Sequence, residues 1–196
     1  MKIAVITGSG GLVGSECCLS FSPIFDHVLG IDNDQRKSFF GEKASVKDSI
    51  DYLKMNLSNY SGLETDLRNK PALEEVFSKY SQDIKLVIHS AAQPSHDWSA
   101  GAPYTDFEIN ALGTLNILEL TRKYSPGAII IFISTNKVYG DHVNYMPMVE
   151  TSTRWELIDT HPYFKHGIDE QLTIDNCVHS PFGVSKASAD FCRYLR

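Results

Sequence analysis

Residues 2–14, KIAVITGSGGLVG, decide the fold of this chain. Residues 2–7 form a continuous run rich in β-branched and apolar side chains, which is typical of a strand buried on both faces of a parallel sheet. A cluster of glycines follows at once, and the next segment, LVGSECCLSF at residues 12–21, reads as a helix. A strand, a glycine-rich turn and a helix in this order predict the first unit of an α/β sheet.

Strand-like and helix-like segments alternate outward from this stretch. The expected strands are 2–7, 26–32, 60–66, 84–92 and 127–135. The expected helices are 12–21, 44–57, 71–80, 103–124 and a last one from about Ser185 to Arg196. Five such alternations predict an α/β fold, with a doubly wound parallel sheet between two layers of helices and right-handed crossovers. Residues 140–180 are expected to be irregular, and a loop of that length is usually functional or poorly ordered.

Composition excludes several classes of protein. The chain has 196 residues, with 18 Lys and Arg against 24 Asp and Glu, so its formal net charge is −6. This acidic balance argues against nucleic acid or an anionic membrane as the main partner. No apolar run approaches the roughly 18 residues of a spanning helix. The four cysteines form neither a disulfide framework nor a CxxC metal pattern, so we expect no metal, reduced thiols and a cytoplasmic protein.

The end of the chain suggests that more sequence belongs to the protein. Residues 1–196 are interpreted as one domain, but the last predicted helix has no C-cap signal and no strand after it. We therefore expect a longer protein, with a C-terminal substrate domain missing from this sequence.

The glycines after the first strand have the spacing of a dinucleotide-binding turn. In this interpretation Gly8 permits the tight turn, Gly11 lets the backbone approach a pyrophosphate, and Gly14 lets helix and strand pack closely. The helix start, with Leu12 and Val13, offers free N–H groups to the phosphates. An ordinary glycine turn is the alternative, and the position directly after the first buried strand favours the dinucleotide.

Asp32 ends the second strand, 18 residues beyond Gly14. A carboxylate there can accept hydrogen bonds from the adenosine ribose and repels a 2′-phosphate, so we expect NAD rather than NADP, with Asn33 beside it. Arg36 is close enough to pair with a phosphate instead. The alternative for Asp32 is a turn carboxylate, because Asp-Asn-Asp is good turn chemistry.

Further candidates follow the third and fourth strands. Ligands in open α/β sheets bind at the carboxyl ends of the strands, where small residues let a flat cofactor lie against the backbone. The expected cofactor contacts here are Asp66, Leu67, Ala91, Ala92, Gln93 and, in the following helix, Asn110. His89 is expected to fill the edge of the sheet rather than to act in catalysis.

The motifs TGSGGLVG, DLRN, HSAAQ, STNKVYG and SKASAD together resemble the extended short-chain dehydrogenase/reductases, the sugar-nucleotide epimerases and dehydratases. The resemblance implies a Rossmann-type domain, bound NAD that is regenerated within one turnover, a nucleotide-sugar substrate and a homo-oligomer in the full-length form. STNKVYGD, GIDE at 167–170 and HSPFGVSKASAD most resemble the branch that epimerises CDP-linked sugars at C2.

The family uses a Ser or Thr, a Tyr and a Lys four residues after the Tyr. Thr135 matches the first and Lys186 the last, but Phe182 stands at the usual Tyr position and has no proton to transfer. The resemblance also implies a cofactor contact for Ser134 and substrate contacts for Gln93, Asn136 and Lys137. Lys137, where dehydratases carry an acid, argues against dehydration.

Phe182 leaves three alternatives open. Another group supplies the base, the protein is an inactive or engineered form, or it binds NAD without performing chemistry. Each substitute base is individually better explained as a loop or substrate-contact residue. The candidates are Tyr145, Tyr163, His161, His166, Asp169 and His179.

Overall fold

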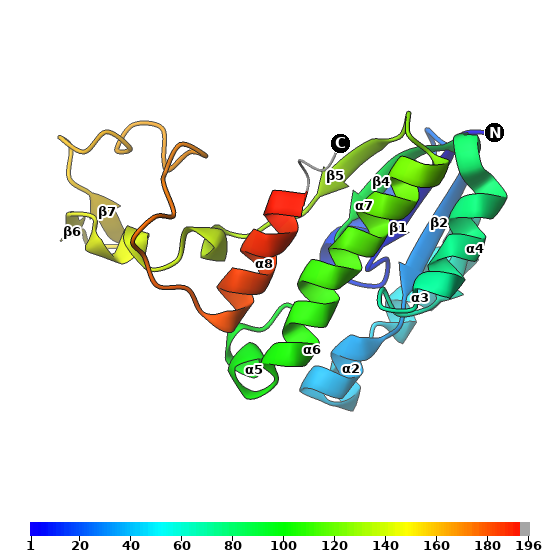
Figure 1. Cartoon of the computed structure of the whole chain (residues 1–196), viewed down its shortest axis with the longest axis horizontal. Helices are drawn as coiled ribbons and strands as arrows, with labels where there is room; N and C mark the ends of the chain where they lie inside the picture. Colours follow the sequence, from blue (N-terminus) through cyan, green and yellow to red (C-terminus); the bar gives the residue numbers. More distant parts are fainter. Residues whose placement is uncertain (193–196) are drawn as a thin grey trace.

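The computed structural model describes residues 1–192, and within them five parallel strands form one central sheet (Figure 1). The strands are β1 (Ile3–Thr7), β2 (His27–Asp32), β3 (Tyr60–Glu64), β4 (Ile84–His89) and β5 (Ile129–Phe132). Their order is β3-β2-β1-β4-β5, and every neighbouring pair is parallel. This confirms the predicted doubly wound sheet. The chain reverses its direction of winding at β1, between β2 and β4, so a crevice is expected at the carboxyl ends of these strands.

Helices cover both faces of the sheet and enclose two apolar layers. One layer, with Ile6, Cys18 and Leu53, lies under α1 (Leu12–Phe21) and α3 (Lys47–Asn56). The other, with Val5, Phe77 and Ile117, lies under α4 (Lys70–Tyr80) and α7 (Gly113–Tyr124). α8 (Pro181–Cys192) packs beside α7 on this second face, toward the viewer in Figure 1.

Short elements connect these layers. Between β2 and β3 lie α2 (Gln35–Phe40) and the 3-10 turn η1 (Glu42–Ala44), and η2 (Ser81–Asp83) precedes β4. After β4 come α5 (His96–Gly101), α6 (Pro103–Phe107) and the π-helical turn η3 (Glu108–Leu112), which runs directly into α7. After β5 come η4 (Asn136–Tyr139), η5 (His142–Tyr145) and the hairpin of β6 (Met148–Glu150) and β7 (Trp155–Leu157).

Several predicted boundaries were wrong. The third strand ends at Glu64, before Asp66, and the fifth covers only Ile129–Phe132. The last helix begins at Pro181 rather than near Ser185, because the fixed backbone angle of proline suits the first helical turn. Its predicted continuation to Arg196 lies outside the described residues. The predicted helix 103–124 is present, but as α6, η3 and α7 in succession.

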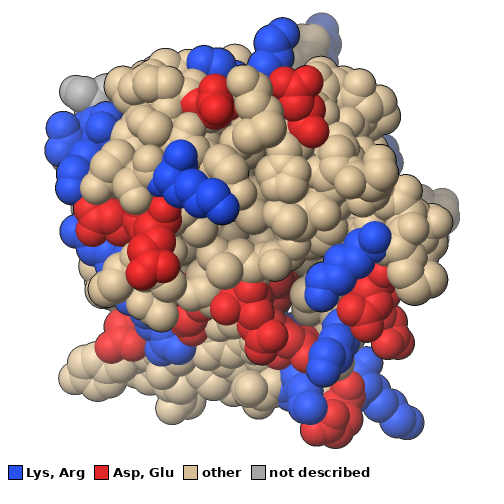
Figure 2. Space-filling view, turned by 90° about the vertical axis from the view of Figure 1, so that its right-hand side faces the viewer, with Lys and Arg blue, Asp and Glu red and all other residues tan. Residues whose placement is uncertain are grey.

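Residues 140–180 are largely irregular, as predicted, and they contain the small β6–β7 hairpin, which lies at the left of Figure 1, away from the central sheet. No helix within residues 1–192 is long and apolar enough to cross a membrane. Figure 2 shows acidic and basic side chains interspersed around an area of other residues on one face of the molecule.

Candidate functional site

The glycine turn brings β1, α1 and the end of β4 into very close contact. Gly8 has a φ of +70°, and a Cβ placed on it would lie 2.8 Å from the backbone nitrogen of Ala91. A Cβ on Gly14 would lie only 2.0 Å from the carbonyl oxygen of Gly8. Neither position accepts a side chain without movement of the backbone. The turn is therefore packed as the sequence predicted for a loop that approaches a ligand through its main chain.

The first turn of α1 has backbone donors to offer. Its N-cap is Gly11, which has no side chain to bond the first amides. Within residues 1–192, the amides of Leu12 and Val13 have no hydrogen-bond acceptor, whereas the Ser15 amide donates to the carbonyl of Gly11. These free N–H groups and the positive end of the helix dipole form an arrangement suited to an anionic group.

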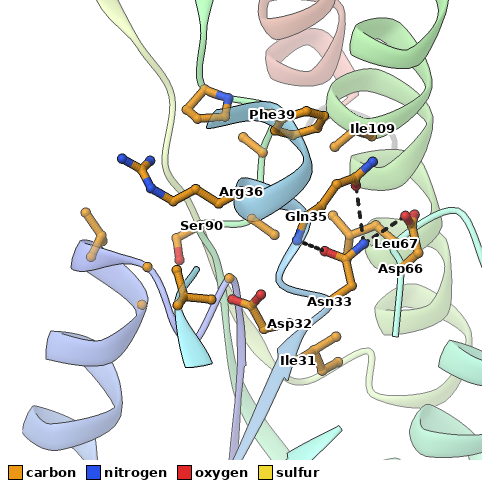
Figure 3. Close-up of a pocket in the computed structure, with 18 of the residues that line it drawn as sticks. Ile31, Asp32, Asn33, Gln35, Arg36, Phe39, Asp66, Leu67, Ser90 and Ile109 are labelled. Carbon is orange, nitrogen blue, oxygen red and sulfur yellow. Dashed lines mark hydrogen bonds between the residues drawn. The ribbon is translucent and has the colours of Figure 1, made fainter. Parts of the chain in front are cut away.

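A cavity lies over the carboxyl ends of β1, β2 and β4, beside this turn (Figure 3). It brings together most of the predicted cofactor residues from four separate segments. They are Gly8, Gly11, Leu12, Val13, Gly14, Asp32, Asn33, Arg36, Asp66, Leu67, Ala91 and Ala92. Sequence reasoning missed the other residues that line it. They are Ile31, Gln35, Phe39, Val46, Thr65, Ser90, Pro94 and Ile109.

Asp32 connects the glycine turn to the segment after β2. Its Oδ2 accepts a hydrogen bond from the Gly10 amide at 2.9 Å, and its Oδ1 accepts one from the Asp34 amide at 2.9 Å. The carboxylate is partly exposed and lines the cavity. Because a carboxylate offers about four lone-pair positions, Asp32 can still accept hydrogen bonds from a ligand's hydroxyl groups.

Asp66 lines the same cavity, but its carboxylate is engaged by the protein. Arg68 donates to it from Nε at 2.9 Å and from Nη2 at 2.8 Å. Asn33 donates to it from Nδ2 at 2.9 Å, and Figure 3 shows this hydrogen bond. The hydrogen bonds from Arg68 hold the pKa of Asp66 below its usual value. The carboxylate is therefore ionised and fixed beside the cavity.

The far wall of the cavity comes from α2. Arg36 places its guanidinium 5.2 Å from the centre of the Phe40 ring and forms no ion pair with any described residue. Phe39 contacts Trp98 of α5, with ring centres 4.4 Å apart. An aromatic pair thus joins the segments after β2 and β4 near the opening of the cavity.

The predicted catalytic residues lie at the neighbouring strand end. Ser134, Thr135 and Asn136 follow β5 and line a second cavity, together with residues 170–174 and the outer face of α8. Lys137 is exposed and does not line it. The hydroxyl oxygen of Thr135 accepts a hydrogen bond from the Lys137 amide at 3.3 Å, which begins the turn η4.

Lys186 reaches the same strand end from α8. It is only 4% exposed, and its Nζ lies 4.5 Å from the centre of the Phe132 ring. Burial lowers the pKa of Lys186 to about 8, against the opposing effect of Asp190 and Asp106. Phe182, one turn earlier on α8, is buried as well. The lysine is thus a buried amine that can change its charge slightly above neutral pH.

Gln93 and Asn110 line neither cavity. Both are buried, and each bonds the other: the Gln93 amide donates to Asn110 Oδ1 at 2.9 Å. Their side chains also contact Asp106 and, for Asn110, Ser185, two residues that sequence reasoning missed. No local pattern marks Asp106 or Ser185, because the network joins positions far apart in the chain.

Of the proposed substitute bases, His179 has a position beside the first turn of α8. Its Nε2 lies 2.9 Å from the carbonyl oxygen of Val138, and its ring contacts the site of Gly183. The other candidates lie on the long loop and line neither cavity. They are Tyr145, Tyr163, His161, His166 and Asp169.

His89 fills the end of β4, as expected. It is 2% exposed, and its ring nitrogens bond the hydroxyls of Thr7 at 2.7 Å and Thr114 at 2.9 Å. Burial lowers its pKa to about 3, so the ring is neutral at physiological pH. A neutral, enclosed imidazole with both nitrogens bonded is a structural part of the sheet edge.

Comparison with known proteins places these features in a wider group. Residues 4–173 match the model of the NAD dependent epimerase/dehydratase family. The chain is 37% identical to CDP-paratose 2-epimerase of Salmonella typhi, over 97% of this chain and 51% of that protein. It is 32% identical to a putative UDP-glucose 4-epimerase of Methanocaldococcus jannaschii, over 74% of this chain and 42% of that protein.

Solved structures show the same fold. UDP-glucose 4-epimerase of Thermus thermophilus, in complex with NAD, superposes with a TM-score of 0.67 at 25% identity, over all of this chain and 50% of that one. The UDP-glucose 4-epimerase of Thermotoga maritima gives a TM-score of 0.66 at 24% identity, again over 50% of that chain. The chain spans about half the length of the relatives it matches most fully.

Proposed function

Because the chain belongs to the NAD-dependent epimerase/dehydratase family, we propose that it is the NAD-binding domain of a nucleotide-sugar epimerase acting on a CDP-linked sugar at C2. The observation that carries the proposal is the cavity at the carboxyl ends of β1, β2 and β4, which the glycine turn and Asp32 border. The CDP-sugar assignment rests on the likeness to CDP-paratose 2-epimerase. A homo-oligomer is part of the proposal for the complete protein.

The residues present suit NAD. Gly8 and Gly14 leave no room for a Cβ, and the free amides of Leu12 and Val13 are suited to the pyrophosphate. Asp32 would accept hydrogen bonds from the adenosine ribose. The small or apolar residues Leu67, Ala91 and Ala92 would face the flat parts of the cofactor.

When bound, NAD supplies reversible two-electron oxidation of a carbinol carbon of the sugar. The chain's own residues orient the reacting groups. Thr135 would hold the sugar hydroxyl, and the Lys186 ammonium would hold the nicotinamide ribose. Ser134 would contact the cofactor, while Asn136, Lys137 and Gln93 are the proposed substrate contacts.

The proton of the sugar hydroxyl needs an acceptor, and Phe182 provides none. His179 is the substitute that the geometry favours, because it lies against the first turn of α8, which carries Phe182. Among the loop candidates, each described side chain is away from both cavities.

A second function is favoured by Phe182 itself. A protein that binds NAD without catalysis would keep the glycine turn and Asp32 and could lose the phenol. Epimerisation of a UDP-linked sugar is the other alternative within the family, since relatives named as UDP-glucose 4-epimerases also match the chain.

Calorimetric titration with NAD and NADP tests the proposal. We expect NAD to bind more tightly. Asp32→Asn keeps the shape of the side chain but removes the charge that repels a 2′-phosphate, so it should narrow the preference. Arg36→Ala serves as the matched variant and should leave the preference for NAD in place. Equal or tighter binding of NADP by the unaltered protein would contradict the assignment of Asp32.

Substrate class is tested in the same instrument. With NAD bound, CDP should bind more tightly than UDP if the CDP-sugar assignment is right, and the reverse order would favour the UDP alternative. Turnover of CDP-paratose, followed by chromatography of the sugar products, separates an active epimerase from a non-catalytic NAD-binding protein.

A further inference from the structure

Asp106 on α6 is a fully buried carboxylate that the proposed reaction does not use. Within residues 1–192, no Lys, Arg or His nitrogen lies within 4.0 Å of its oxygens. Its partners are instead three polar side chains. Gln93 donates from Nε2 at 2.7 Å, Asn110 from Nδ2 at 3.1 Å and Ser185 from Oγ at 2.5 Å.

The three donors come from three different elements and also bond one another. Gln93 follows β4, Asn110 lies in η3 and Ser185 lies in α8. Asn110 Nδ2 is 3.0 Å from Ser185 Oγ, and its Oδ1 accepts from the Gln93 amide. All four side chains are at most 2% exposed. Burying a carboxylate is costly without such donors, and an apolar contact would join helices at lower cost. The arrangement therefore points to a role beyond packing.

This network joins two parts of the proposed site. Gln93 directly follows Ala91 and Ala92, which line the cavity beside the glycine turn. Ser185 directly precedes Lys186, whose Nζ is held at the end of β5. A single acceptor, Asp106, thus fixes both the wall of the cofactor cavity and the helix turn that carries the lysine.

We propose that Asp106 is the positioning residue of the site, which holds the segment of Gln93 and the Ser185–Lys186 turn in one arrangement around the cofactor. The inference rests on the proposed function for its purpose, although the geometry it predicts does not. Asp106 touches neither cavity and acts through its three partners.

The charges around Lys186 give this role an electrostatic side. Asp106 on α6 and Asp190 on α8 both favour the charged ammonium, and burial opposes it. His89 on β4 also faces the lysine but is neutral. Burial raises the pKa of Asp106, while the hydrogen bonds from Ser185 and Gln93 lower it. Loss of the Asp106 charge should therefore favour the neutral form of Lys186.

The test compares isosteric variants of the full chain. Asp106→Asn removes the charge and turns one acceptor into a donor, and Ser185→Ala removes one donor. Thr121→Val is the matched control, because Thr121 is equally buried and bonds only the Ile117 carbonyl within α7. Two quantities are measured: the NAD dissociation constant at pH 7, and the rate of reductive methylation of Lys186, read by peptide mass spectrometry across pH 6–10.

We expect Asp106→Asn and Ser185→Ala to weaken NAD binding by on the order of tenfold, as the loss of a hydrogen bond to a charged group does. We also expect both to speed methylation of Lys186, and Asp106→Asn to move its pH midpoint downward. Thr121→Val should change neither quantity.

The proposal is overturned if both variants match Thr121→Val in binding and methylation, whatever their melting temperatures. If Asp106→Asn does not fold, Ser185→Ala decides by the same two measurements. If the unaltered protein does not bind NAD, the proposed function fails, while the methylation of Lys186 still decides the role of Asp106.

Discussion

The Nζ of Lys186 donates a hydrogen bond to the carbonyl oxygen of Ile133 at 3.0 Å. The Ile133 amide in turn donates to the carbonyl oxygen of His89 at 3.0 Å, so the lysine is connected through β5 to the end of β4. Ser90, the next residue of that segment, lines the proposed cofactor cavity. The amine is therefore placed beside two strand ends, at the cost of most of its hydration.

That loss of hydration predicts a pH dependence of stability. An unfolded chain keeps Lys186 protonated up to its ordinary pKa of 10.5, whereas the folded protein releases the proton near pH 8. Unfolding therefore takes up a proton between these values, and the contribution of Lys186 to the free energy of unfolding rises with pH in that window. The slope from this group approaches about 1.4 kcal/mol per pH unit.

Lys186→Met isolates this contribution from other titrating groups. The variant keeps a similar volume without the charge, so its stability should exceed that of the unaltered protein below pH 8, and the difference should shrink toward pH 10.5. Urea unfolding at several pH values measures it. A difference that stays constant with pH would contradict the assigned burial of the charge.

Gly14→Ala should damage the glycine turn. The new Cβ would meet the Gly8 carbonyl oxygen at 2.0 Å, so the backbone must move, at a cost of about 1–3 kcal/mol. NAD binding should fall with it, because the amides of Leu12 and Val13 would shift. Gly101→Ala is the control, since nothing lies within 4 Å of its Cβ position, and it should change stability by less than about 0.5 kcal/mol. Thermal unfolding and calorimetry measure both.

Phe182→Tyr tests the missing phenol on the proposed function. If the phenol is the only defect, the rate of CDP-paratose epimerisation should rise by about 10²–10⁴-fold, the usual contribution of a positioned general base. Phe182→Leu is the apolar control and should not raise it. An unaltered protein that already turns over well, with no gain from Phe182→Tyr, would place the base elsewhere, with His179 the next residue to replace. Lys186→Ala should weaken NAD binding and abolish turnover in every case.

The outer edge of β5 predicts self-association. Ile129 is 64% exposed and Ile131 41% exposed, and the described residues place no strand beside them. Ile131→Lys should reduce association in sedimentation velocity, because a charged edge strand resists pairing. Ile130→Lys, on the face packed against the core, should instead unfold the protein. Association that is unchanged by Ile131→Lys would show that another surface carries it.

Much of the fold and part of the candidate site could be predicted from sequence because the relevant signals are local. The buried strands are continuous apolar runs, and a glycine turn needs only adjacent residues to be recognised. Gly8, Asp32 and Ala91 come together because the carboxyl ends of parallel strands share one edge. Their proximity follows from the strand order and needs no knowledge of side-chain packing.

The remaining contacts depend on tertiary packing. Phe39 belongs to the six-residue helix α2, which is too short for its periodicity to be recognised, and its partner Trp98 lies on α5. Asp106 and Ser185 are 79 residues apart in the chain. Nothing near Asp106 distinguishes it from a solvent-exposed helix residue, so its complete burial could not be predicted.

The π-helical turn η3 has a consequence for changes of chain length. Such a turn closes an i→i+5 hydrogen bond and so encloses one residue more than a turn of α-helix. Deletion of the exposed Leu112 would therefore let the segment become regular α-helix while α6 and α7 keep their facing. Deletion in the middle of α7 would instead rotate the rest of that helix by about 100°. In an alignment of this helix, a gap of one residue at the π turn is compatible with an unchanged fold.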